Sequence, residues 1–151
     1  MGWVLAEEYM KIESQISGAF TGWHGNALFK LVNGQFWLQA EYKYKYRYKY
    51  RPRAVITRSG GGYQLEVEGM DSTVLVRQVN AIESNIDGEF TGWSGNTEFR
   101  LQNGEIWQQA AYAYWYHYAY NPEVIIYESS GGYVICLPDD PSTNVGVRRI
   151  R

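Results

Sequence analysis

The chain has 151 residues, of which 45% are hydrophobic and 20% charged, a balance typical of compact domains and not of disordered or collagen-like chains. Aromatic residues make up 17% of it, and the glycines and prolines fall largely at apparent turns, which together favour β structure. The formal net charge of −2 differs from the basic charge that dedicated nucleic-acid-binding proteins usually carry.

No stretch approaches the roughly 20 apolar residues that span a bilayer. The first residues also lack the charged and apolar regions of a secretion signal. The single cysteine, Cys136, cannot form an intrachain disulfide or a cysteine-based metal site, which agrees with a reducing compartment. We therefore expect a cytoplasmic protein with no membrane partner.

An internal duplication organises the chain. When the sequence is shifted by 70 residues, residues 12–73 align without gaps on residues 82–143, with 31 identities in 62 positions. This predicts two tandem domains, repeat one over residues 12–80 and repeat two over residues 82–151. Residues 1–11 have no counterpart and form an N-terminal arm in this interpretation.

Each repeat reads as a series of short strands. The pattern in repeat one predicts strands at residues 12–20, 27–32, 35–50, 53–58, 63–68 and 74–79, with equivalents 70 or 71 residues later. The pair Asn33-Gly34 favours a two-residue type I′ hairpin turn. Five or six antiparallel strands in so short a domain imply a closed or half-closed barrel, because closure removes exposed edges. The predicted fold class is therefore all-β, with two tandem antiparallel small barrels.

The run from residue 35 to residue 50 is too long to remain straight. Fully extended, it would span about 53 Å at about 3.3 Å per residue. Both copies place a small residue inside it, Ala40 and Ala110, so we expect a bend or bulge there.

Two aromatic features recur in both repeats. The segment Phe-Thr-Gly-Trp, which ends at Trp23, is either an exposed stacking site or, as we favour, a loop whose tryptophan caps the barrel end. Five tyrosines then alternate over residues 42–50, so they share one face of a strand. We expect their rings to pack on neighbouring strands with the hydroxyl groups at a wet boundary.

The other face of that strand differs between the repeats. In repeat one it is cationic and carries Lys43, Lys45, Arg47, Lys49 and Arg51, followed by Arg53. In repeat two the matching face is nearly apolar and carries Ala113, Trp115, His117 and Ala119. Residues 1–80 hold ten basic and seven acidic residues, a net charge of +3, whereas residues 81–151 hold four and nine, a net charge of −5.

Three interpretations of the cationic face remain open. It binds a polyanion such as single-stranded nucleic acid, with Tyr44, Tyr46 and Tyr48 available for stacking. Alternatively, it docks on the acidic half of this or a second molecule, which would make a homo-oligomeric scaffold. The third interpretation is a strand protected from edge-to-edge aggregation by its charges. In each case, the six basic side chains should be exposed or paired with acids, because a buried unpaired charge costs several kcal/mol.

The apolar face of repeat two should be covered. An exposed Trp115 between two alanines would form an apolar stripe that a soluble monomer seldom displays. We expect the cover to come from the other repeat or from a second molecule, as in a homodimer.

Signatures of catalysis are missing. The two histidines have no cysteine or histidine partner at metal-ligand spacing, and the chain has no Walker loop or nucleophile-elbow motif. Cys136 lies in an apolar strand and reads as a buried small residue. We expect no enzyme activity, no cofactor and no metal.

The repeated motifs Phe-Thr-Gly-Trp-x-Gly-Asn, Asn-Gly-x-x-Trp-x-Gln and alternating tyrosine before proline resemble a repeat of uncharacterised bacterial proteins among SH3-like small barrels. The resemblance covers both repeats and implies no activity or ligand. The sequence thus predicts a non-enzymatic binding module: a polyanion binder along the basic strand of repeat one, or a scaffold or protein-interaction module using the Tyr/Trp-rich strands.

Overall fold

The computed structural model describes residues 11–151, and every regular element in that range is a β-strand. The chain divides into two compact units, with the boundary between Val79 and Asn80. The predicted arm lies outside the described residues except for Lys11, where the first strand begins. No helix in the described part of the chain has the length and apolar character to cross a membrane.

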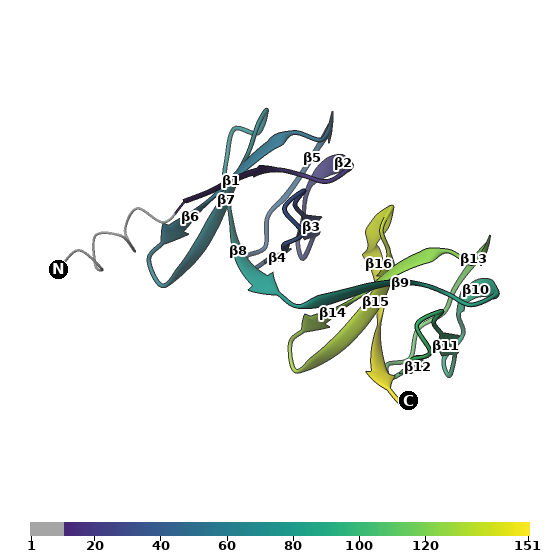
Figure 1. The fold of residues 1–151 in the computed structure, drawn as a ribbon. Helices are drawn as coiled ribbons and strands as arrows, with labels where there is room; N and C mark the ends of the chain where they lie inside the picture. Colours follow the sequence, from purple (N-terminus) through teal and green to yellow (C-terminus); the bar gives the residue numbers. More distant parts are fainter. Residues whose placement is uncertain (1–10) are drawn as a thin grey trace. The chain divides into compact units, whose positions relative to one another are not determined.

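The first unit combines a six-stranded antiparallel sheet with a two-stranded ribbon (Figure 1). The sheet has the order β1-β6-β7-β8-β4-β3, and the ribbon pairs β2 with β5. The strands are β1 (Lys11–Gln15), β2 (Ala19–His24), β3 (Leu28–Lys30), β4 (Phe36–Gln39), β5 (Tyr44–Tyr50), β6 (Arg53–Ser59), β7 (Gly62–Val67) and β8 (Val74–Val79).

The second unit repeats this arrangement strand for strand. Its sheet, taken from the first strand, has the order β9-β14-β15-β16-β12-β11, and its ribbon pairs β10 with β13. The strands are β9 (Ala81–Asn85), β10 (Glu89–Trp93), β11 (Glu98–Arg100), β12 (Ile106–Gln109), β13 (Trp115–Tyr120), β14 (Glu123–Ser129), β15 (Gly132–Leu137) and β16 (Asp140–Arg149). The prediction of two all-β small barrels of similar topology is confirmed.

Two of the predicted strands are each divided in two, so a repeat has eight strands and not five or six. The run at residues 12–20 breaks after Ile16, which bridges to Leu31, and turns through Gly18 at a φ of 84°. The run at residues 35–50 breaks at Ala40, as expected, where the backbone N–H donates to the Leu75 carbonyl at 2.7 Å. Each break lets the chain leave the six-stranded sheet and enter the ribbon.

The β3–β4 hairpin turn differs in type from the prediction. A type I′ turn needs positive φ at both central residues, and here Gly34 has a φ of 91° whereas Asn33 is not in that region. The loop has three residues, closed by bonds from Gly34 N to Leu31 O (3.0 Å) and from Leu31 N to Gln35 O (2.9 Å). Asn33 Oδ1 accepts from Gln35 N at 3.0 Å, which explains the asparagine without a positive φ.

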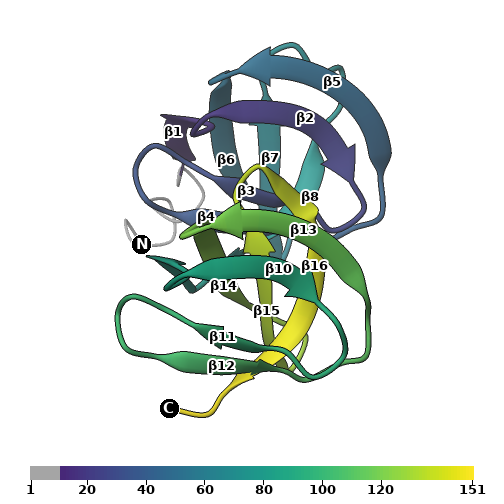
Figure 2. The same ribbon diagram turned by 90° about the vertical axis from the view of Figure 1, so that its right-hand side faces the viewer.

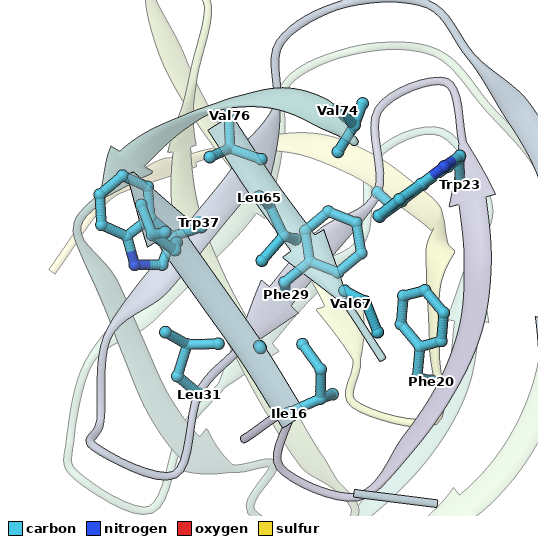
Figure 3. Packing of buried hydrophobic residues seen from close by; sticks show 13 residues of the cluster. Ile16, Phe20, Trp23, Phe29, Leu31, Trp37, Leu65, Val67, Val74 and Val76 are labelled. Carbon is cyan, nitrogen blue, oxygen red and sulfur yellow. The ribbon is translucent and has the colours of Figure 1, made fainter. Parts of the chain in front are cut away.

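The core of unit one lies between the ribbon and the sheet. Figure 2 shows β2 and β5 running side by side across the sheet, and Figure 3 shows Phe20 and Trp23 projecting from β2 toward Phe29. The ring of Trp23 is edge-on to the rings of Phe20 and Phe29, at 5.6 and 5.8 Å. Trp23 is fully buried at 0% exposure, so the burial of this tryptophan is confirmed, although it lies on a strand and not in a capping loop.

Candidate functional site

The β2–β5 ribbon turns one face inward and one outward. Phe20 is buried and pairs directly with Lys49, so the cationic row of β5 shares the inward side of the ribbon with Phe20. Side chains alternate along a strand, and the tyrosines of β5 therefore point outward. Repeat two has the same inward and outward faces, because Phe90 pairs with Ala119 and Trp93 pairs with Trp115.

A buried glutamine positions the start of β5. Gln39 Nε2 donates to the carbonyls of Glu41 (3.0 Å) and Lys43 (2.9 Å), and its Oε1 accepts from His24 N at 3.1 Å. In repeat two, Gln109 Nε2 donates to the matching carbonyls of Ala111 and Ala113, whereas its Oε1 accepts from Gly95 N, one residue beyond the counterpart of His24. Reasoning from the sequence missed this glutamine, although its identity in both repeats, next to the bend, was the available signal.

The tyrosines of these strands are the most exposed aromatic residues within residues 11–151, which corrects the prediction that their rings pack on neighbouring strands. Their exposed fractions run from 54% to 87%. We call the two groups tyrosine face one (Tyr42, Tyr44, Tyr46, Tyr48 and Tyr50) and tyrosine face two (Tyr112, Tyr114, Tyr116, Tyr118 and Tyr120). The prediction of a shared face is correct, but the environment predicted for that face is wrong.

Three of the six predicted basic residues have partners. Lys43 Nζ donates to the Thr73 carbonyl at 2.6 Å and lies 3.7 Å from Glu41. Lys45 Nζ lies 2.8 Å from Asp71 Oδ2, and this hydrogen bond is the main reason that the pKa of Asp71 is lowered.

Arg53 completes this group, with its guanidinium 3.3 Å from Glu13. The expectation that each basic side chain is exposed or paired with an acid holds at five of the six positions, and Lys49 is half-buried with no ion pair in the described residues.

The other three, Arg47, Lys49 and Arg51, form no ion pair within residues 11–151. The side chain of Lys49 lies against Gly69, whereas Arg47 and Arg51 are exposed. Arg51 has a φ of 50°, in the left-handed region where arginine is uncommon, and its N–H donates to the Gly18 carbonyl at 2.8 Å. The counterpart in repeat two is Asn121, a residue that adopts this conformation readily.

The apolar face of repeat two packs on the core of its own unit, a source of cover that the sequence analysis did not include. Ala113, Trp115 and Ala119 are half-buried against that core. The indole of Trp115 lies 4.7 Å from the ring of Trp93 and 6.3 Å from that of Phe90, measured between centroids. It covers the core tryptophan at the position that Lys45 occupies in repeat one.

His117 is exposed and stacks on Trp115 at 5.0 Å with an interplanar angle of 5°. Cys136 is fully buried, as predicted, and burial raises the pKa of its thiol to about 12. Within residues 11–151, no group of three histidine, cysteine or carboxylate residues is placed to hold a metal ion.

The structure separates two groups that were predicted to form one ligand site. Tyr44, Tyr46 and Tyr48 lie on the outward face of β5, whereas the cationic row lies on the inward side beside residues 68–73. A ligand that stacks on the tyrosines therefore meets the cations only at the margins of the ribbon.

No family model, curated protein or solved structure matches this chain.

Proposed function

We propose that this protein is a non-enzymatic interaction module that binds other macromolecules through its two tyrosine faces. The observation that carries the proposal is the outward exposure of all ten face tyrosines, at equivalent positions in both units. If these tyrosines belonged to the core, they would be buried in both repeats. A role in the core does not explain why both repeats keep large aromatic side chains exposed to water.

Tyrosine suits such a surface physically. Its ring supplies a large apolar area with few rotatable bonds, and its hydroxyl group can hydrogen-bond to a partner or to water. The strands that carry the tyrosines have only one strand partner each within the described residues, so the ribbons also present backbone edges. The single cysteine, reduced and buried, is consistent with action in the cytoplasm.

Photo-cross-linking tests the proposal directly. A benzoylphenylalanine residue replaces Tyr46 or Tyr116 in the full chain in cells, and covalent adducts are identified by mass spectrometry. We expect specific adducts from both positions. The matched control places the probe at Val32, an exposed apolar residue outside the faces. Adducts that are equal at Val32 and at the two face positions, or absent from the faces, would contradict the proposal.

A second candidate function is polyanion binding by repeat one, favoured by three basic residues that form no ion pair with any residue the structure describes. With Arg47, Lys49 and Arg51 each neutralising one phosphate of a single strand, log affinity should fall against log salt with a slope near −2, from about −0.7 per phosphate. Recruitment of all six basic residues would instead give a slope near −4. Titrations of single-stranded DNA, RNA and heparin measure this, and binding that is absent at low salt or independent of salt rules the candidate out.

A further inference from the structure

The two tyrosine faces carry the same aromatic residues with different charges beside them. In repeat two, Glu89 pairs directly with Tyr120, so its carboxylate shares the outward side of the ribbon with the tyrosines. In repeat one, the matching pair is Ala19 with Tyr50, and the exposed Arg51 follows that tyrosine. Tyrosine face two therefore has a negative charge at its end, whereas the matching end of tyrosine face one has no acid and adjoins the exposed Arg51.

We propose that tyrosine face one of one chain docks on tyrosine face two of a second copy of the same chain. This inference rests on the proposed function, because it names the partner of the same faces. Opposite charges steer face one toward face two, and like charges disfavour the pairing of two copies of face two. The net charges of the two halves, +3 and −5, act in the same direction over longer distances.

The available area fits an interface of moderate strength. A buried tyrosine contributes 150–250 Å², so five rings that are more than half exposed offer roughly 600 Å² on each face. Two such faces bury roughly 1,200 Å², at the lower end of the range for specific interfaces. A pair of chains that exchanges both contacts doubles this area, and we expect association at micromolar concentrations.

The backbone at residue 51 supports a role for the arginine side chain. Its left-handed conformation is one that asparagine adopts readily, and Asn121 does so in repeat two, where its Oδ1 accepts from Gly88 N at 2.6 Å. The side chain of Arg51 cannot accept a bond of this kind, and the residue precedes a proline, which restricts its backbone further. A strained position that carries an exposed charge in one repeat only is consistent with selection for that charge.

A mixing experiment with the full chain tests the pairing. One variant loses face one through Tyr46→Ser and Tyr48→Ser, and the other loses face two through Tyr116→Ser and Tyr118→Ser. Circular dichroism checks that both fold. In sedimentation velocity, we expect the wild type to associate, each variant alone to remain monomeric, and their mixture to form a one-to-one complex, because each variant supplies the face that the other lacks.

A charge reversal provides a second test of the pairing. Glu89→Arg should weaken association about tenfold relative to the wild type, since it places a cation opposite tyrosine face one and the arginine beside it. Asp139→Arg makes the same change of charge at an exposed site in the turn between β15 and β16, outside the ribbon that carries tyrosine face two, and it should leave association within about twofold of the wild type.

The outcomes separate this inference from the proposed function. Self-association of either single-face variant would show pairing of like faces and overturn the inference. A wild type that stays monomeric throughout would also overturn it, whether the faces are free or contact each other within one chain. In either case, cross-links from Tyr46 and Tyr116 to a different protein would leave the proposed function standing, whereas the absence of adducts would remove both.

Discussion

Gly22 lies so close to the backbone of Lys45 that a Cβ atom at this glycine would stand 1.9 Å from the Lys45 carbonyl oxygen. The φ of Gly22 is also 102°, a conformation that L side chains rarely adopt. In repeat two, Gly92 stands in the same relation to Trp115, again at 1.9 Å. This close approach lies at the bulge in each ribbon, where the strand register shifts next to the glycine.

Replacement of Gly22 by alanine should therefore destabilise the first unit strongly. The positive φ and the clash with a backbone atom together should lower the free energy of unfolding by about 3 kcal/mol. Gly61 is the control, because a Cβ there meets nothing within 4 Å and its φ is not positive. Urea denaturation should show Gly61→Ala close to the wild type, and equal effects of the two changes would contradict the close-approach argument.

Gln39 should be needed for the bend between β4 and β5. Gln39→Leu removes three hydrogen bonds to half-buried backbone groups, of which only the Lys43 carbonyl keeps a second donor, Gly25 N, so we expect a loss of about 3 kcal/mol in unfolding free energy. Gln78→Leu makes the same chemical change at an exposed position of β8 and should alter stability by less than about 0.5 kcal/mol. A Gln39→Leu variant as stable as the Gln78→Leu variant would show that the bend forms without these bonds.

The features that could be predicted from sequence are those that depend on short segments of the chain or on a comparison of its two repeats. The duplication, the β class and the bend at Ala40 follow from identity at fixed spacing, from composition and from the limit on strand length. The turn at Asn33-Gly34 was located correctly but assigned the wrong type, because the same pair also fits a three-residue loop with a glycine bulge.

The direction of the tyrosines was not predictable in this way. Alternation shows that residues share a face, but which face is buried depends on pairing with a strand distant in sequence, here Phe20 opposite Lys49. A rule that places apolar side chains inward fails at β5, because lysine stems can lie along apolar surface while their ammonium groups reach water or acids. The acid that receives Lys45, Asp71, lies 26 residues further along the chain.

Arg51→Asn should stabilise the protein. Asparagine is favoured in the left-handed region and can reproduce the bond that Asn121 makes to a glycine N–H, so we expect a gain of about 1 kcal/mol and a melting temperature higher by a few degrees. The reverse change, Asn121→Arg, should lower stability by a similar amount. Thermal unfolding measures both, and a destabilising Arg51→Asn would show that arginine is the better residue for this backbone.

Trp115→Lys should destabilise repeat two without changing the mass of the protein in solution. The change introduces the residue type of position 45, but it removes the indole that covers Trp93 and Phe90, so we expect a loss of about 2 kcal/mol. A double-mutant cycle with Phe90→Leu should reveal coupling between the two rings. A change in sedimentation with unaltered stability would instead place Trp115 in an interface between chains.

Stability should fall at alkaline pH because of two buried acids. Burial raises the pKa of Cys136 from 9.0 to about 12 and also raises that of Tyr127, with the Cys136 charge adding to the second shift. Above pH 9 the unfolded thiol loses its proton while the folded thiol keeps it, so stability is full below pH 9 and declines as the pH rises. Between pH 9 and 10 the thiol alone should cost about 1 kcal/mol, with tyrosine adding to the decline at higher pH. Urea unfolding measured between pH 8 and pH 10 tests this, and Cys136→Ala should lose this first part of the decline. If the variant shows the same pH dependence as the wild type, the effect belongs to other groups.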